Sequence, residues 1–344
     1  MKKERIPNSE PLKYFSRYNK KTNESKKNKN LLVENPKMTV ESNKKYHLYR
    51  EMAYMADKFW PDVFDWIEEN ETVFIKSQKF LKRHYLRKET RTKMVDWMVE
   101  VFYLTKSDPY TFELAVHIMD RYIQMTKKIL YDKDIHLIGL TCIYIASKMM
   151  DDEPIKLINI SKNIGKSEFL NIDIIEKEKE ISSSIEYEFL YNGIYDVLMA
   201  LFFDLNVTYY KIIDEIKGKE IIGKYMDFCV ILSKLILYNE SLLSYKTSLI
   251  SVVIINFGFD ILNLNEKKLS KDIRYFLTEW IRYIINEMNI ITYDMNNVYN
   301  EILNLYKIYI YQPIQENNNI KFGIKEKRKV EQINLLKLYK DKLI

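Results

Sequence analysis

Apolar side chains recur at helical spacing in the first half of the chain. Two sets occupy positions i, i+3, i+4 and i+7, namely Met94, Trp97, Met98 and Val101, then Ala115, Ile118, Met119 and Tyr122. Such positions share one face of an α-helix, so the pattern predicts helices over residues 90–105 and from an N-cap at Thr111. After Asp132, which we expect to cap the next helix, the residues are almost all apolar as far as Ile145. A helix that is apolar all round is buried, so this one is predicted to form the centre of a domain.

The same helical character extends through the rest of the chain. Further helices are expected over 155–163 and 169–189, which makes five in the first half. In the second half one stripe and one apolar run stand out, at Tyr225, Phe228, Cys229, Leu232, Leu235 and Ile236 and at 249–257. The 344 residues include only 7 Gly and 7 Pro, too few for the frequent turns of a sandwich or barrel. We therefore predict an all-α protein with room for about two domains.

Composition changes at both ends of the chain. Residues 1–45 hold 13 Lys/Arg against 5 Asp/Glu and few apolar residues, which predicts a disordered basic tail. Because the whole chain is +6, the remainder is slightly acidic. Residues 46–72 include a predicted amphipathic helix that carries Phe59 and Trp66, and residues 313–344 form a charged tail.

Four charged residues lie within the apolar helices of the first half: Arg91, Asp120, Lys148 and Glu178. A charge among core-facing residues costs several kcal/mol unless it is paired or faces a partner. Each of the four therefore needs a partner, either inside the fold or outside it.

The chain resembles the cyclins, the regulatory subunits of cyclin-dependent kinases. Residues 90–100 (TRTKMVDWMVE) resemble the motif that opens the cyclin box, and further motifs follow in the family's order at Asp120-Arg121, Leu137, Gly139, Ala146-Ser147-Lys148, Glu178 and Tyr187-Glu188-Phe189. The resemblance covers roughly Phe59 to Gln312 and is strongest to A/B-type (G2/mitotic) cyclins. It implies two consecutive five-helix cyclin folds, a kinase-binding box at 73–192 and a second fold at 193–312. In the second fold Ser251 and four β-branched residues after it replace an Ala-rich helix.

The resemblance also implies roles for individual residues. The kinase-binding positions would be Val63, Trp66, Lys148, Met149, Glu178, Ser182, Tyr187 and Phe189. Plain core packing is the alternative for Val63 and Trp66, and complementing the helix dipole is the alternative for Lys148. Arg91 and Asp120 match a buried salt bridge between the first two helices of the box, a structural role.

A substrate-docking groove is where the chain departs from the family. The groove positions are Thr90, Lys93, Met94, Trp97, Glu100, Ile135 and His136. Thr90 and Lys93 replace large apolar side chains, and a lysine there would repel the arginine of a docking motif of the R-x-L type. The sequence therefore predicts weak or altered docking of such motifs.

Other function classes receive little support. The chain has no catalytic motif, and its two Cys and four His do not form a metal-binding pattern, so we expect no enzyme activity, cofactor or metal. The expected partner is a kinase catalytic subunit, with substrate or inhibitor proteins besides, and neither nucleic acid nor membrane. The alternatives are a cyclin-fold scaffold without kinase activation and a TFIIB-like transcription factor, although the latter would need a zinc ribbon. A soluble protein of nucleus and cytoplasm is expected.

Overall fold

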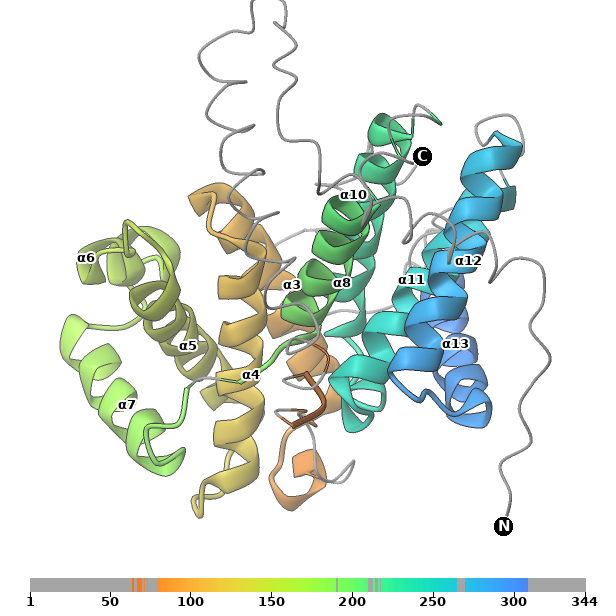
Figure 1. The fold of residues 1–344 in the computed structure, drawn as a ribbon. Coiled ribbons are helices and arrows are strands. Elements are labelled where there is room, and N and C mark those ends of the chain that lie inside the picture. Colours follow the sequence, from red (N-terminus) through yellow and green to blue (C-terminus); the bar gives the residue numbers. More distant parts are fainter. Residues whose placement is uncertain are drawn as a thin grey trace, which may run out of the picture. The chain divides into compact units, whose positions relative to one another are not determined.

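Helices account for nearly all of the regular structure in this computed structural model (Figure 1). The structure describes residues 64, 67–69, 71, 73, 80–189, 191–209, 213, 216, 218–264 and 270–308. All of them belong to one unit, residues 59–344. Val63 and Trp66 lie outside the described residues, as do the whole predicted basic tail, most of residues 46–72 and the whole charged C-terminal tail.

The first group of helices packs around α5. It comprises η1 (Phe80–Arg83), α3 (Lys88–Thr105), α4 (Pro109–Met125), η2 (Asp132–Asp134), α5 (Ile135–Met150), α6 (Leu157–Asn159), η3 (Ile160–Ile164) and α7 (Asn171–Ser184). α5 contacts α3, α4 and α7, and most of its residues are buried. Gly139 lets α3 approach closely, because a Cβ at that position would overlap the side chain of Met94.

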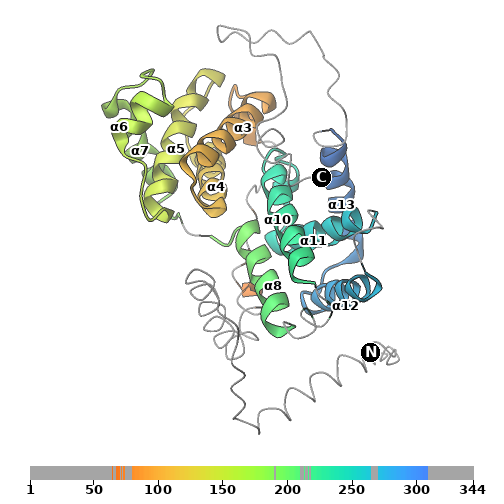
Figure 2. The same ribbon diagram turned by 90° about the horizontal axis from the view of Figure 1, so that it is seen from above.

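The second group packs around α11 in the same way (Figure 2). It comprises α8 (Ile194–Thr208), α10 (Lys219–Ile236), η4 (Leu242–Ser244), α11 (Thr247–Leu264), α12 (Lys271–Glu287) and α13 (Thr292–Tyr306). α11 contacts the other four α-helices, and residues Ile250 to Ile255 are fully buried. The β-branched run that replaces the family's small residues is therefore part of the core.

Two of the predicted helix starts are wrong. α4 begins at Pro109, and its N-cap is Asp108, whose Oδ1 accepts the Tyr110 N–H at 2.8 Å. Proline suits the first helical position because it has no N–H to leave unsatisfied. Thr111 is a fully buried residue inside the helix. Asp132 lies in the 3-10 turn before α5, where it accepts the backbone N–H of Arg87 at 3.0 Å.

The helix predicted over 169–189 is shorter at both ends. α7 ends at Ser184, and the backbone then turns through Glu186 and Tyr187, which both have a φ of 58°. The N–H of Tyr187 returns to the carbonyl of Ser182 at 2.9 Å, which closes the helix end. A left-handed conformation in two successive residues other than glycine costs about 1–3 kcal/mol each, so surrounding contacts must hold this turn in place.

Polar contacts connect α3 of the first group to the end of α10 in the second. Arg91 Nη1 donates to the carbonyl of Leu237 at 3.0 Å, and Thr92 Oγ1 donates to the carbonyl of Tyr238 at 3.3 Å. The Tyr238 hydroxyl donates in turn to Asp96 at 2.6 Å. Backbone carbonyls near a helix C-terminus lack helical partners, so these donors satisfy groups that would otherwise be unpaired.

Candidate functional site

Lys148 and Glu178 meet on the surface where α5 and α7 pack together. Their side chains form an ion pair, and they remain 37% and 22% exposed. Lys148 Nζ also lies 4.4 Å from the centre of the Tyr144 ring, one turn earlier on α5. A partly exposed ion pair contributes about 0–1 kcal/mol to folding, so the pair adds little to stability. Both groups are accessible to a partner and are already oriented by each other.

The apolar residues predicted around this pair differ in exposure. Met149 is 45% exposed and Tyr187 is 68% exposed, whereas Phe189 is half-buried against the core. Ser182 is only 7% exposed, and its carbonyl holds the turn at Tyr187. Met149 and Tyr187 are therefore the most exposed apolar residues of this set, while Ser182 is buried.

Arg91 and Asp120 form a fully buried, bidentate ion pair between α3 and α4. Arg91 Nε donates to Asp120 Oδ1 at 2.7 Å, and Nη2 donates to Oδ2 at 2.6 Å. Burial alone would lower the pKa of Arg91, but the charge and hydrogen bonds of Asp120 outweigh it and raise the pKa. The sequence suggested this pair but not the third bond, to Leu237, which makes Arg91 a link between the two helix groups.

At the predicted docking groove, the aromatic rings of Trp97, His136 and Phe169 contact one another in series. Trp97 on α3 is half-buried, and its ring lies edge-on to His136 at 5.2 Å. His136 in turn meets Phe169 edge-on at 5.3 Å, and its Nδ1 is 3.0 Å from a carboxylate oxygen of Glu168. Of the remaining positions, Met94 and Ile135 are buried, Thr90 and Glu100 are half-buried, and Lys93 is exposed.

Residues 62–189 match the sequence profile of the family described as Cyclin, N-terminal domain. Residues 62–189 therefore form a cyclin N-terminal domain. The chain is similar to the G2/mitotic-specific cyclin-B of Emericella nidulans, with 27% identity over 138 residues, which is 40% of this chain and 28% of the relative. It is also similar to the G1/S-specific cyclin-E of Drosophila melanogaster, with 28% identity over 115 residues, 33% of this chain and 16% of the relative. The aligned part thus spans less than a third of either relative.

The fold of this chain is also found among solved structures. The X-ray structure of a viral cyclin from herpesvirus saimiri aligns with a TM-score of 0.56 and 17% identity, covering 71% of this chain and 96% of that chain. This likeness extends the cyclin-like fold beyond the N-terminal domain. Cyclins are non-catalytic regulatory subunits, which agrees with the expectation that this chain is not an enzyme. The relatives include both G2/mitotic and G1/S cyclins, so the A/B subtype stays a prediction.

Two clusters that the sequence reading missed lie close to the predicted site. Glu180 on α7 accepts the Tyr122 hydroxyl at 2.5 Å and pairs with Lys177 and Lys128, each at 3.0 Å. Burial would raise the pKa of Glu180, but these partners outweigh it and lower the pKa to about 2. Phe169 and Glu168, beside His136, are the second cluster. The spacing of Lys177 and Glu180, three positions apart on one helix, could have indicated their ion pair from the sequence. The contact of Glu180 with Tyr122 could not be predicted in this way, because the two residues are 58 positions apart.

Because Thr90 and Lys93 replace apolar side chains in the predicted docking groove, we expect this chain to bind standard R-x-L peptides poorly. We expect the double substitution Thr90→Met/Lys93→Leu to raise the affinity for such a peptide at least about tenfold. It removes a cation and adds two apolar side chains, and burying each of them contributes about 1.5–3 kcal/mol to the free energy of binding. Calorimetry with a standard R-x-L peptide measures both proteins. Micromolar affinity in the wild type would contradict the prediction. The control is Lys162→Leu, which removes one positive charge at an exposed position on η3 and so tests for a general effect of lost charge.

Proposed function

We propose that this cyclin binds and activates a cyclin-dependent Ser/Thr protein kinase through the surface around Lys148 and Glu178. The observation that supports this proposal is the solvent-accessible ion pair between α5 and α7, which is accompanied by exposed apolar side chains. Apolar area supplies affinity in such an interface, and a few charge-assisted hydrogen bonds fix the register of the partner. Because the pair adds little to folding, its position at the surface is better explained by a partner.

Activation follows from preferential binding. A protein kinase is active only when a glutamate on its mobile helix pairs with the lysine that holds the ATP phosphates. A regulatory subunit shifts the kinase toward that arrangement only to the extent that it binds the active form more tightly than the inactive form. Met149 and Tyr187 would contact the mobile helix, while Lys148 and Glu178 would bond to backbone groups beside it.

The cell-biological role that we propose is control of cell division, at G2/M, by a protein of nucleus and cytoplasm. Support comes from the A/B-type motifs and from the similarity to the cyclin-B of Emericella nidulans. The similarity to a G1/S cyclin makes G1/S entry the competing stage. Synchronised cells would separate the two, because kinase activity associated with this chain should peak at the stage that it controls.

Capture of a kinase from the protein's own cells tests the proposed function directly. The tagged chain is used in a pull-down, and histone kinase activity is then measured in the recovered material. We expect the wild type to recover an active kinase and Lys148→Ala/Glu178→Ala to lose about 30-fold or more of it, because truncated interface charge pairs cost 2 kcal/mol or more.

The matched control for this experiment is Lys224→Ala/Glu220→Ala. Those residues form an exposed Lys–Glu pair at 2.6 Å on α10, so the control removes the same two charges from another helix. If this control loses the kinase equally, the surface between α5 and α7 is not the binding site. If the wild type recovers no kinase, a cyclin-fold scaffold is the function that remains.

A further inference from the structure

The carboxylate of Asp151 gathers three hydroxyl groups at the C-terminal end of α5. Its Oδ2 accepts from Ser147 at 2.7 Å and from Ser107 at 2.9 Å, and its Oδ1 accepts from Thr111 at 2.7 Å. The Ser147 hydroxyl accepts in turn from the N–H of Ile155 at 2.8 Å. The Asp151 side chain therefore connects α5 to the loop before α4 and to the first turn of α4, and Ser147 connects α5 to the segment before α6.

The position of this carboxylate is electrostatically unfavourable in itself. Asp151 is the C-cap residue of α5, and its N–H bonds to the carbonyl of Ser147 at 3.0 Å. A negative charge at a helix C-terminus opposes the helix dipole. Hydrogen bonds to a charged acceptor are about twice as strong as neutral ones, so the three hydroxyls offset this cost. The same three hydrogen bonds also hold the C-terminal end of α5 in place.

The last turn of α5 contains two of the residues that we propose contact the kinase. Lys148 and Met149 lie between Ser147 and Asp151, in the last turn of α5. Helix ends fray readily because their final carbonyls have no helical partner. Ser147 and Thr111 are fully buried, so their bonds to Asp151 anchor the last turn to the protein interior.

We infer that Asp151 is a positioning residue, whose carboxylate clamps the last turn of α5 and holds Lys148 and Met149 in the conformation that the kinase binds. This inference rests on the proposed function. It assigns no contact between Asp151 and the kinase. The clamp lowers the conformational entropy lost on binding, because the last turn is ordered before the partner arrives.

The test compares Asp151→Asn, Thr111→Val and Asp152→Asn in the full chain. The first variant weakens the acceptor, and the second removes one buried donor while leaving the carboxylate in place. The third makes the same charge change at the next residue, which is exposed. Affinity is measured with the kinase recovered by the wild type and produced recombinantly, well below the unfolding temperature. Amide hydrogen exchange at 147–151 is measured on the free chain.

We expect Asp151→Asn and Thr111→Val each to weaken kinase binding about tenfold and to accelerate exchange at 147–151, because each leaves buried polar groups without full partners. Their effects should not add in the double variant, and Asp152→Asn should match the wild type. Wild-type affinity in Asp151→Asn overturns the inference. So does weaker binding with unchanged exchange, because Asp151 would then act by contact.

Failure of the inference can be told apart from failure of the proposed function. Exchange in the free chain reports the clamp whether or not a kinase binds. If Lys148→Ala/Glu178→Ala binds the kinase as tightly as the wild type, the proposed surface is wrong, whatever Asp151 does. If Lys148→Ala/Glu178→Ala loses affinity but the Asp151 and Thr111 variants keep it, the proposed binding surface is supported and the inference about Asp151 is wrong.

Discussion

Replacement of Arg91 by alanine is expected to lower the free energy of unfolding by about 3–5 kcal/mol, because it leaves the buried carboxylate of Asp120 without its counterion. The side chains of Arg91 and Asp120 are 1% and 0% exposed, so water cannot take over the lost bonds. The carbonyl of Leu237 loses a donor as well. Since native domains are stable by only about 5–15 kcal/mol, this is a large part of the total.

Urea unfolding followed by circular dichroism measures this effect. Arg87→Ala is the matched control, because Arg87 pairs with Asp132 but is 65% exposed, and surface pairs are worth at most about 1 kcal/mol. Arg91→Lys keeps the charge and loses the bidentate geometry, so it should fall between the two. Equal stability of Arg91→Ala and Arg87→Ala would show that the buried pair contributes no more to stability than a surface pair does.

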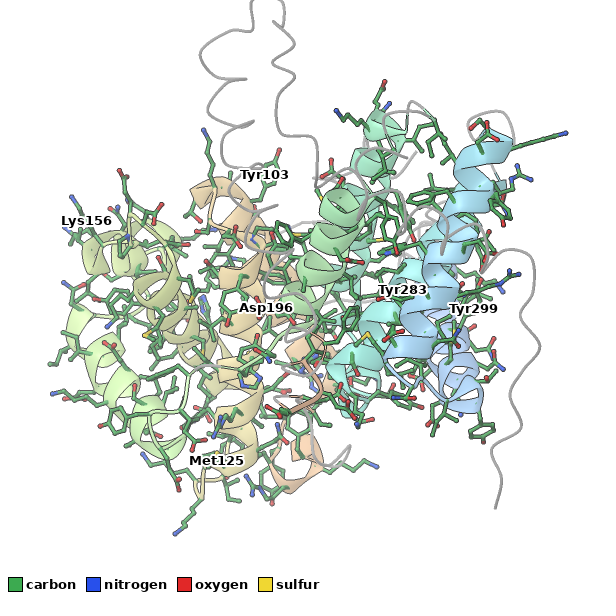
Figure 3. All side chains as sticks on the ribbon, viewed as in Figure 1. Tyr103, Met125, Lys156, Asp196, Tyr283 and Tyr299 are labelled. Atoms are coloured by element: carbon green, nitrogen blue, oxygen red, sulfur yellow. The ribbon has the colours of Figure 1, made fainter. Side chains whose placement is uncertain are left out.

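Unfolding should also depend strongly on pH through Glu113, a second buried carboxyl group. Glu113 lies on α4 and accepts the N–H groups of Ile194 at 2.6 Å and of Tyr195 at 2.9 Å, at the first turn of α8. Gly193 leaves room for this contact, because a Cβ there would lie 2.9 Å from the carboxyl group. Asp196, on the same turn of α8 and labelled in Figure 3, acts on Glu113 through its charge.

Burial, together with a smaller effect of the charge of Asp196, raises the pKa of Glu113 to about 8 against the lowering effect of the two N–H groups. The folded chain therefore holds this proton more tightly than the unfolded chain does. The resulting stabilisation is complete below about pH 4.5, the ordinary value, and is lost as the pH rises through about 8.

Glu113→Gln should remove this dependence, because the glutamine side chain is neutral at every pH. Relative to the wild type, the variant is expected to gain about 3–4 kcal/mol between pH 5 and pH 8.5. Chemical unfolding of both proteins at several pH values measures the gain, and other titrating groups cancel in the comparison. Glu153→Gln, at an exposed position, is the control. Parallel pH profiles for wild type and Glu113→Gln would contradict the prediction.

Local patterns in the sequence were sufficient to predict which segments are helical and which helices are buried. The spacing of Met94, Trp97 and Met98 predicted α3, and the apolar run before Ile145 predicted that α5 is central. This information is local, because helix formation and amphipathicity depend on residues within one or two turns. The charges inside these helices also showed that Arg91 and Asp120 needed partners, and the resemblance to cyclins suggested that they pair with each other.

Only the tertiary structure decided which distant groups meet. The bond from Arg91 to Leu237 joins residues 146 positions apart, and Glu113 reaches Ile194 across 81 positions. The carboxylate of Asp151 reaches Thr111 across 40 positions, although the sequence predicted Thr111 as a helix cap. Such contacts depend on how whole helices pack, and polar groups that the packing buries need a hydrogen-bond partner. Packing also placed Ser182 beneath the surface while leaving Met149 and Tyr187 exposed, a difference that helical periodicity alone does not contain.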